Sequence, residues 1–175
     1  EEPERHVWAA EVGTAALPWL VDHQVNNVAA MPGAAFCEMA LSAARTALGD
    51  AAEVRDIRFE RMLLLEDETQ VSVQAAARSN GTLDFLVETD QDGERERRAS
   101  AVLSAAEDTG RPAAYDMEAL HAAHPMRADG GDIRHWFDTR GVQFGPAFTA
   151  LIAVNAGDDA DETVLAEVGL PTVIR

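Results

Sequence analysis

Apolar residues follow two different spacings along the chain, and together they predict one long helix and a series of strands. From Pro32 to about Leu48 nearly every face of a helix would be apolar, and Gly49-Asp50 provides a stop. A helix that is apolar nearly all round belongs in the interior of a fold. The sequence therefore predicts one buried central helix, with Cys37 as a small core residue rather than a nucleophile.

Short runs with the apolar or alternating pattern of strands lie on both sides of this helix. Those before it are His6–Glu11, Gly13–Leu17 and the extended segment Asp22–Asn26. Those after it are Val54–Phe59, Met62–Leu65, Gln70–Ala77, Thr82–Thr89 and Arg95–Ser104, with hairpin turns at 79–81 and 90–93. One long helix followed by a meander of antiparallel strands predicts an α+β fold in which a sheet wraps around the helix.

Beyond the meander the pattern predicts a second, smaller set of elements. Residues 107–115 are polar and contain glycine and proline, as a linker does. Two short helices that begin at a capping aspartate and two strands are expected after it: Asp116–His121, Asp132–Thr139, Phe144–Val154 and Thr163–Leu170. No second long apolar helix follows in the sequence. We therefore expect residues 1–106 to form one domain and residues 116–175 to begin a second that this chain leaves incomplete.

The charge and the cysteine content exclude several classes of protein. A formal net charge of −17 argues against nucleic acid and anionic membrane surfaces as partners. The apolar content of 47% is enough for a proper core, yet no apolar run has the length of a membrane span. The single Cys37 excludes an internal disulfide and fits a reducing cytoplasm. Since the chain begins at Glu1 without Met or a signal peptide, we expect a cytoplasmic protein of which this is one piece.

One stretch combines the residue types that removing a proton beside a carbonyl requires. His23 lies nine residues before Pro32-Gly33, which opens the apolar helix. Glycine lets another group approach the backbone, and the N–H groups at a helix start can hold a carbonyl oxygen that gains negative charge. An imidazole nearby can act as the base. His23 is therefore the candidate base and Gly33 the candidate carbonyl site, while the neighbouring Asp22 is expected to be structural.

The residues around His23 also resemble the dehydratase domains of polyketide synthases, in which His-x3-Gly-x4-Pro precedes an apolar helix. Here the frame is His23, Asn27 and Pro32, with Asn27 in place of the family's Gly. Leu17-Pro18-Trp19-Leu20 resembles the family's His-Pro-Trp-Leu, with Leu17 replacing the His. Further on, the segment from Gly141 to Phe148 resembles Gly-Tyr-x-Tyr-Gly-Pro-x-Phe, with Val142 and Phe144 where the family has its tyrosines.

The resemblance implies a hotdog fold, here the first half of a double hotdog with the second half incomplete. It implies loss of water from a 3-hydroxyacyl thioester on an acyl carrier protein, which gives a 2-enoyl thioester. In this interpretation His23 is the base and the Gly33 N–H holds the thioester carbonyl. The residues that line the substrate tunnel are Met31, Pro32, Phe144, Gly145 and Pro146.

In this family the acid that protonates the leaving hydroxyl is an Asp on the long helix of the second hotdog, which we expect beyond Arg175. Glu38 is the alternative, because single-hotdog fatty-acid dehydratases use a Glu at the matching place with a His of the partner subunit. In double hotdogs this position is usually structural, and that interpretation is preferred here.

The resemblance implies no bound metal or redox cofactor, and a substrate carried on the phosphopantetheine arm of the carrier protein. The expected partners are the carrier protein and the neighbouring synthase domains, with a homodimer formed through the parent synthase. Two other classes of function stay open. One is a noncatalytic double-hotdog module for dimerisation or carrier docking, and the other is a hotdog thioesterase.

Two further groups of residues have an ordinary structural interpretation. His121, His124 and His135 lack the ligand spacing of a known metal site and are expected to be exposed helix histidines. The run from Glu94 to Arg98 mixes charges and is expected to be a solvated strand face. A docking surface for an acidic carrier protein is the alternative interpretation of that run.

Overall fold

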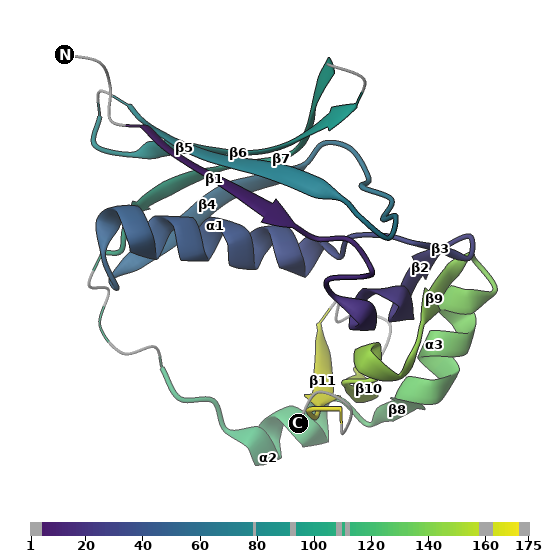
Figure 1. Cartoon of the computed structure of the whole chain (residues 1–175). Coiled ribbons are helices and arrows are strands. Elements are labelled where there is room, and N and C mark those ends of the chain that lie inside the picture. Colours follow the sequence, from purple (N-terminus) through teal and green to yellow (C-terminus); the bar gives the residue numbers. More distant parts are fainter. Residues whose placement is uncertain are drawn as a thin grey trace. The chain divides into compact units, whose positions relative to one another are not determined.

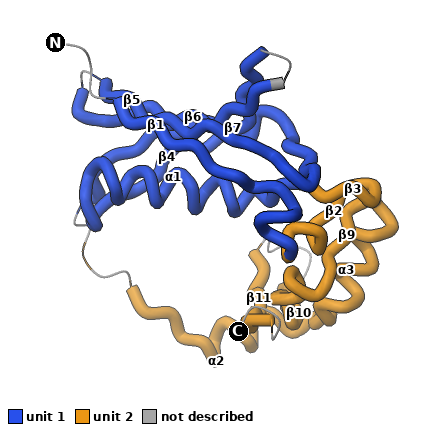
Figure 2. Tube along the Cα trace, in the orientation of Figure 1, with its two compact units in different colours: residues 1–18, 30–108 blue, residues 19–29, 109–175 orange. Residues whose placement is uncertain are grey.

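The chain divides into two compact units (Figure 2). Unit 1 comprises Glu1–Pro18 and Ala30–Asp108, and unit 2 comprises Trp19–Ala29 and Thr109–Arg175. The computed structural model describes residues 5–78, 80–91, 94–107, 110, 113–157 and 163–171. The predicted turn residues 79, 92 and 93 and the predicted linker residues 108, 109, 111 and 112 lie outside the described residues.

Unit 1 is a five-stranded antiparallel sheet packed on one long helix, α1 (Gly33–Leu48) (Figure 1). The strands follow the order β1 (Arg5–Glu11), β5 (Gln70–Ala77), β6 (Leu83–Gln91), β7 (Glu94–Ala105) and β4 (Ala52–Phe59). One row of paired residues crosses the whole sheet: Trp8, Val73, Val87, Ala99 and Phe59. Its three central members are buried, as is the next row of Ala75, Phe85 and Ala101. The sheet packed on a helix confirms the prediction from the sequence pattern and agrees with the hotdog fold that the resemblance implies.

Helix α1 contributes only one stripe of residues to the core. Phe36, Ala40, Ala43 and Ala44 are buried, a spacing that places them on one side of the helix. Cys37 is exposed, so its prediction as a core residue is wrong. The exposed polar residues Glu38, Ser42 and Thr46 recur at every fourth position and mark the outward side of α1, which the prediction of a helix apolar nearly all round overlooked. The predicted stop is confirmed, because Gly49 ends α1 with a φ of 95° and its N–H donates to the Arg45 carbonyl.

Two predicted strands of unit 1 are not strands. The segment from Gly13 to Leu17 is a turn, in which the Leu17 N–H donates to the Gly13 carbonyl at 2.9 Å. A Cβ on Gly13 would lie 2.2 Å from the Asp67 carbonyl oxygen, so the turn requires the backbone of Asp67 to come close to Gly13. The local apolar pattern gives no sign of this contact with a distant segment. The segment from Met62 to Leu65 makes one isolated bridge, between Ala30 and Leu64, because its partner runs straight on into α1.

Unit 2 contains two three-stranded sheets and short helices. One sheet has the order β3 (Val28–Ala29), β2 (His23–Val25) and β9 (Val142–Phe144). The other has the order β11 (Val164–Val168), β10 (Leu151–Ala156) and β8 (Met126–Asp129). The α-helices are α2 (Met117–Ala123) and α3 (Gly130–Asp138), and the 3-10 helices are η1 (Pro18–Asp22), which begins at the last residue of unit 1's first segment, and η2 (Pro146–Phe148).

The predicted helix starts in unit 2 have different outcomes. Asp116 caps α2 as predicted, since its side chain accepts the N–H groups of Glu118 at 3.0 Å and Ala119 at 3.1 Å. Asp132 does not cap a helix, because α3 already begins at Gly130. A Cβ at Gly130 would lie 1.9 Å from the Leu151 carbonyl oxygen, so contact with β10 selects this start.

The predicted strand from Phe144 to Val154 is interrupted. Strand β9 ends at Phe144, Pro146 starts η2, and β10 begins only at Leu151. Proline has no N–H for a strand ladder, and it suits the first turn of a helix. The strand predicted over Thr163–Leu170 is present as β11. None of the helices in the described ranges has both the length and the hydropathy that crossing a bilayer requires.

Candidate active site

Strands β2 and β9 bring together the two sequence motifs that carry the family resemblance. His23 pairs with Phe144, Gln24 with Gln143, and Val25 with Val142. Beyond the strands, the Asn26 N–H donates to the Gly141 carbonyl at 2.7 Å. The histidine segment and the segment from Gly141 to Phe148 therefore form one local structure within unit 2.

The turn after His23 explains the asparagine that replaces the family's glycine. Asn26 and Asn27 have φ values of 51° and 64°, which is the left-handed region. Among residues with a side chain, asparagine is one of the few that adopts this region readily. The Asn27 N–H also donates to the Gln143 side chain at 3.1 Å. Asn27 thus preserves the backbone conformation that a glycine would provide.

Asp22 is the structural carboxylate that the sequence predicts. Its side chain accepts the Ala147 N–H at 2.8 Å, and its carbonyl accepts the Gly145 N–H at 2.6 Å. A Cβ on Gly145 would lie 2.3 Å from Asp22 Oδ1, so only glycine fits this contact without a shift. The two bonds anchor the start of β2 to the turn between β9 and η2.

The His23 imidazole is half-buried among aromatic rings. Its centroid lies 5.6 Å from that of Phe144 and 5.3 Å from that of Phe148. Phe148 is also 5.9 Å from Trp19, which belongs to the Leu17–Leu20 motif. All of these rings belong to unit 2. The aromatic contacts orient the imidazole, and Phe144 supplies one of them at a position where the family has tyrosine.

Gly33 lies in unit 1, together with the predicted tunnel residues Met31 and Pro32. As the first residue of α1, Gly33 has an N–H with no acceptor one turn earlier in the helix. A Cβ on Gly33 would lie 3.3 Å from the Phe59 ring. The Met31 and Pro32 side chains are buried. The structure thus groups the predicted site residues in two sets, with His23, Phe144, Gly145 and Pro146 in unit 2.

Glu38, the alternative acid, is exposed on α1. It lies five residues after Gly33, and its carboxylate accepts the Ser42 hydroxyl at 3.3 Å. This bond joins positions i and i+4 of the same helix and is a common arrangement on a helix surface. The contact is in keeping with the structural role that the sequence analysis prefers for Glu38.

A hollow of about 390 Å³ lies in unit 2 beside this strand pair, and the sequence patterns did not indicate it. Gln24 and Gln143, which face each other across β2 and β9, line it together with Arg134, His135 and Asp138 of α3. His23 is not among the lining residues. Its strand partner Phe144 does line the hollow, together with the neighbouring Asp22 and Gly145.

The three other histidines of the sequence analysis do not form a metal site in the described part of the chain. His121 and His135 are exposed, as predicted. His124 is 5% exposed, so its prediction as an exposed histidine is wrong. It follows the end of α2, and its ring nitrogens lie 2.7 Å from the Leu120 carbonyl and 2.9 Å from the Thr163 hydroxyl. Both ring nitrogens of His124 are therefore satisfied by the protein.

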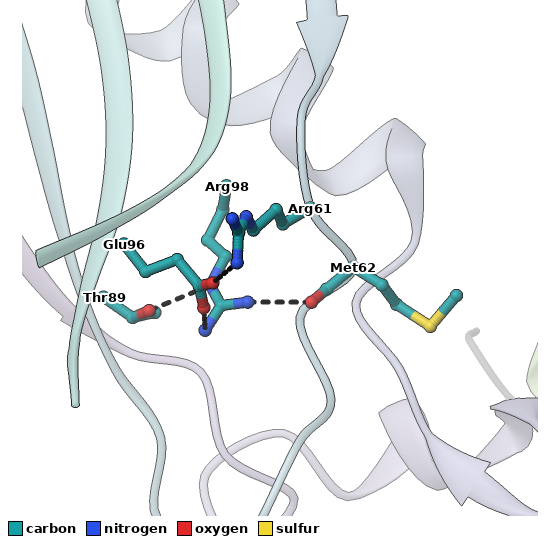
Figure 3. Close-up of polar contacts among 5 residues, drawn as sticks. All are labelled: Arg61, Met62, Thr89, Glu96 and Arg98. Atoms are coloured by element: carbon teal, nitrogen blue, oxygen red, sulfur yellow. Dashed lines mark hydrogen bonds and ion pairs between the residues drawn. The ribbon is translucent and has the colours of Figure 1, made fainter.

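The charged run from Glu94 to Arg98 is only partly a solvated face. Arg98 is buried, and Figure 3 shows it between Thr89, Glu96 and the Met62 carbonyl. The prediction of a solvated face is therefore wrong for Arg98. The register of β7 against β6 shifts between Ala99 and Arg97, so that Arg98 is an extra residue that breaks the alternation of the strand. The exposed Arg61, Arg95 and Arg97 each face a glutamate within 4 Å, so their charges are compensated.

Comparison with known proteins relates the chain to one family. Residues 1–90 match the family model described as "Polyketide synthase dehydratase domain". The phthioceranic/hydroxyphthioceranic acid synthase of Mycobacterium tuberculosis is 59% identical over 177 residues, which cover 100% of this chain and 8% of that protein. A mycocerosic acid synthase-like polyketide synthase of Mycolicibacterium smegmatis is 50% identical over 175 residues, with coverages of 100% and 8%.

Solved structures agree with this relation. The dehydratase domain of a mycocerosic acid synthase-like polyketide synthase matches with a TM-score of 0.94 and 50% identity, over 99% of this chain and 61% of that one. A dehydratase domain of the curacin polyketide synthase matches with a TM-score of 0.89 at 17% identity, over 97% and 62%. The second likeness shows the fold alone. The chain therefore spans 8% of its curated relatives and about three fifths of the solved domain.

Proposed function

Since the chain belongs to the polyketide synthase dehydratase domain family, we propose that it takes part in removing water from a 3-hydroxyacyl thioester to give a 2-enoyl thioester. The observation that carries this proposal is the pairing of His23 with Phe144, which joins the family's two motifs in one local structure. A polyketide-like lipid is the proposed product class, in keeping with the names of the mycobacterial relatives.

His23 is the proposed base, which removes a proton from the carbon beside the thioester carbonyl. Its half-burial between Phe144 and Phe148 supports this role, because a base has to hold a constant orientation toward the proton that it removes. The neighbouring Asp22 accepts the Ala147 N–H, and in this proposal it has a structural role beside the base.

Gly33 is the proposed site for the thioester carbonyl. Its position at the start of a 16-residue helix supports this role, since the helix dipole and the open N–H both favour an oxygen that gains negative charge. Met31, Pro32, Phe144, Gly145 and Pro146 are the proposed tunnel residues. The buried Met31 and Pro32 would contribute apolar surface next to the carbonyl site.

The proposed acid is an Asp of the domain's second long helix, outside this chain. The share of the solved dehydratase that the chain spans, 61%, leaves room for that helix. The substrate would arrive on the phosphopantetheine arm of an acyl carrier protein, and neighbouring synthase domains and a second synthase chain are the other proposed partners. No metal or redox cofactor is part of the proposal.

The direct test uses the complete dehydratase domain and a 3-hydroxyacyl pantetheine thioester, followed by mass spectrometry. Loss of the mass of one water supports the proposal. An unchanged thioester would instead indicate a noncatalytic module, and release of the free acid would indicate a thioesterase. Replacing His23 by Ala in the same assay tests whether the water loss depends on the proposed base.

A further inference from the structure

Arg98 is a buried arginine in the sheet of unit 1, at 7% exposure. Its guanidinium lies 2.5 Å from the Glu96 carboxylate, and its Nε donates to the Thr89 hydroxyl at 2.9 Å. A buried charge is costly unless it is paired and hydrogen-bonded, and these two contacts meet that requirement. They come from β6 and β7, so they fix the guanidinium relative to the sheet.

Arg98 also holds the loop that follows β4. Its Nη1 donates to the Met62 carbonyl at 2.9 Å, and its own carbonyl accepts the N–H groups of Glu60 at 2.9 Å and Arg61 at 3.3 Å. The Arg61 side chain reaches the same Glu96 carboxylate at 2.5 Å (Figure 3). Side chain and backbone of one residue thus attach three consecutive loop residues to the sheet.

The same loop contacts the segment that leads into α1. The Leu63 carbonyl accepts the Met31 N–H at 2.9 Å, and Leu64 forms a bridge with Ala30. At the end of β4, where the loop begins, the Phe59 ring lies 3.3 Å from the place of a Cβ on Gly33. Pro32 between them makes no side-chain capping bond to the helix. The loop from Phe59 to Leu64 therefore contacts the residues on both sides of Pro32.

We propose that Arg98 is a positioning residue for the thioester carbonyl site at Gly33, acting through the loop from Phe59 to Leu64. The inference rests on the proposed function, in which the Gly33 N–H holds that carbonyl. A hydrogen-bond donor stabilises a developing oxyanion only when it is held in place before the reaction. Arg98 provides this rigidity from the sheet without touching the substrate.

The chemistry of arginine fits this role better than a contribution to stability alone. A buried ion pair is often no more stabilising than apolar residues of the same volume. The planar guanidinium can donate in three directions at once, to Thr89, Glu96 and Met62. Lysine carries the same charge on a single ammonium group and cannot reproduce this fork.

The test measures the carbonyl directly in the complete dehydratase domain. The probe is butyryl pantetheine with a ¹³C-labelled thioester carbonyl, which has no 3-hydroxyl and cannot lose water. Infrared difference spectra of the bound probe report how strongly the site polarises the carbonyl. Steady-state kinetics with the 3-hydroxyacyl thioester are measured in parallel. The variants are Arg98→Met and, as the matched control, Arg95→Met, which removes an exposed arginine of the same strand.

In the unsubstituted domain the carbonyl band is expected to move to lower frequency on binding. Arg98→Met should lose most of this shift and lower kcat by about 10–100-fold, since a small misplacement of a catalytic donor has effects of that size. KM should stay within about threefold, and Arg95→Met should behave like the unsubstituted domain. A lower kcat with the full band shift would overturn the proposal, because Arg98 would then act on stability alone.

A second variant covers the case in which Arg98→Met does not fold. Arg98→Lys keeps the charge beside Glu96 and should show a reduced band shift and an intermediate kcat, whereas a full shift with full kcat would overturn the proposal. If the unsubstituted domain binds the probe with no band shift, the role of Gly33 in the proposed function fails as well. A shift that is present and insensitive to both Arg98 variants rejects only the positioning role.

Discussion

The carboxylate of Asp22 accepts a hydrogen bond from the backbone N–H of Ala147 at 2.8 Å, although the two residues are 125 positions apart in the chain. The Ala147 side chain is buried, and the N–H of the nearby Gly145 donates to the Asp22 carbonyl. The contact attaches the residue before His23 to the turn that follows Phe144. It therefore links the position of the proposed base to the second motif of the family.

Replacing Asp22 by Ala is expected to destabilise unit 2 by about 1–3 kcal/mol, because a buried N–H then loses its acceptor. Hydrogen exchange of the Ala147 amide should become faster, and the unfolding free energy should fall. Asp22→Asn is the matched control, since its side-chain oxygen can still accept this bond and should preserve most of the protection. Unchanged exchange of the Ala147 amide in Asp22→Ala would show that the bond does not hold the turn.

Replacing His23 by Ala in the complete domain is expected to lower the rate of water loss by about 10²–10⁴-fold, the usual contribution of a positioned base. Circular dichroism and the melting temperature should change little, because the ring is only half-buried. His121→Ala removes an exposed histidine of α2 and serves as the control. Activity within about threefold of the unsubstituted domain would exclude His23 as the base.

The 175-residue chain by itself is expected to be inactive on a 3-hydroxyacyl thioester, because dehydration needs an acid as well as a base. In the complete domain, Glu38→Gln should leave turnover nearly unchanged, since Glu38 is exposed and bonded to Ser42. The measurement is turnover of the chain, of the complete domain and of the Glu38 variant. Robust turnover of the chain alone that disappears in Glu38→Gln would favour a single-hotdog site with two chains.

The stability of unit 1 is expected to fall at acidic pH because of Glu11. Backbone hydrogen bonds from Thr69 and Gly13 hold the pKa of the Glu11 carboxyl below its ordinary value of 4.5. Because the pKa of Glu11 is lower in the folded state than in the unfolded chain, the ionised carboxylate stabilises the folded state at pH values above the pKa of the unfolded chain. This contribution is lost as the pH falls through the lower, folded pKa.

Thermal melts of Glu11→Gln between pH 7 and pH 2 test this dependence. The variant should be less stable than the unsubstituted protein at neutral pH, and the difference should shrink as the pH falls below 4.5. Glu68→Gln, a nearby substitution, is the control for a general loss of negative charge. A stability difference that stays constant over the whole range would contradict the assignment.

Much of unit 1 could be predicted from the sequence because its signals are local. The apolar run over α1, the glycine stop at Gly49 and the alternating strands of the β5–β6–β7 meander depend on residues within a few positions of one another. A local preference of asparagine for the left-handed region likewise accounts for the turn after His23, although Asn26 was included in a segment expected to be extended. Local conformational preference was sufficient for these elements.

Burial and strand ends needed the tertiary structure. The predicted burial was wrong for three residues: Cys37 is exposed, whereas His124 and Arg98 are buried. The burial of a side chain depends on which distant segment of the chain covers it. The turn at Gly13 and the start of α3 at Gly130 both follow from a backbone carbonyl that approaches from far along the chain.

For the candidate site, the sequence by itself singled out the residues that are proposed to carry the chemistry, namely His23, Gly33 and the motif that contains Phe144. Their roles stay predictions. Only the tertiary structure decided that β2 pairs with β9 and that Asp22 accepts the N–H of Ala147. The same is true of the hydrogen bond from Arg98 to the Met62 carbonyl in the loop after β4. The physical reason is that residue type and spacing encode local conformation and reactivity. Hydrogen bonds between distant segments instead depend on how the whole chain packs.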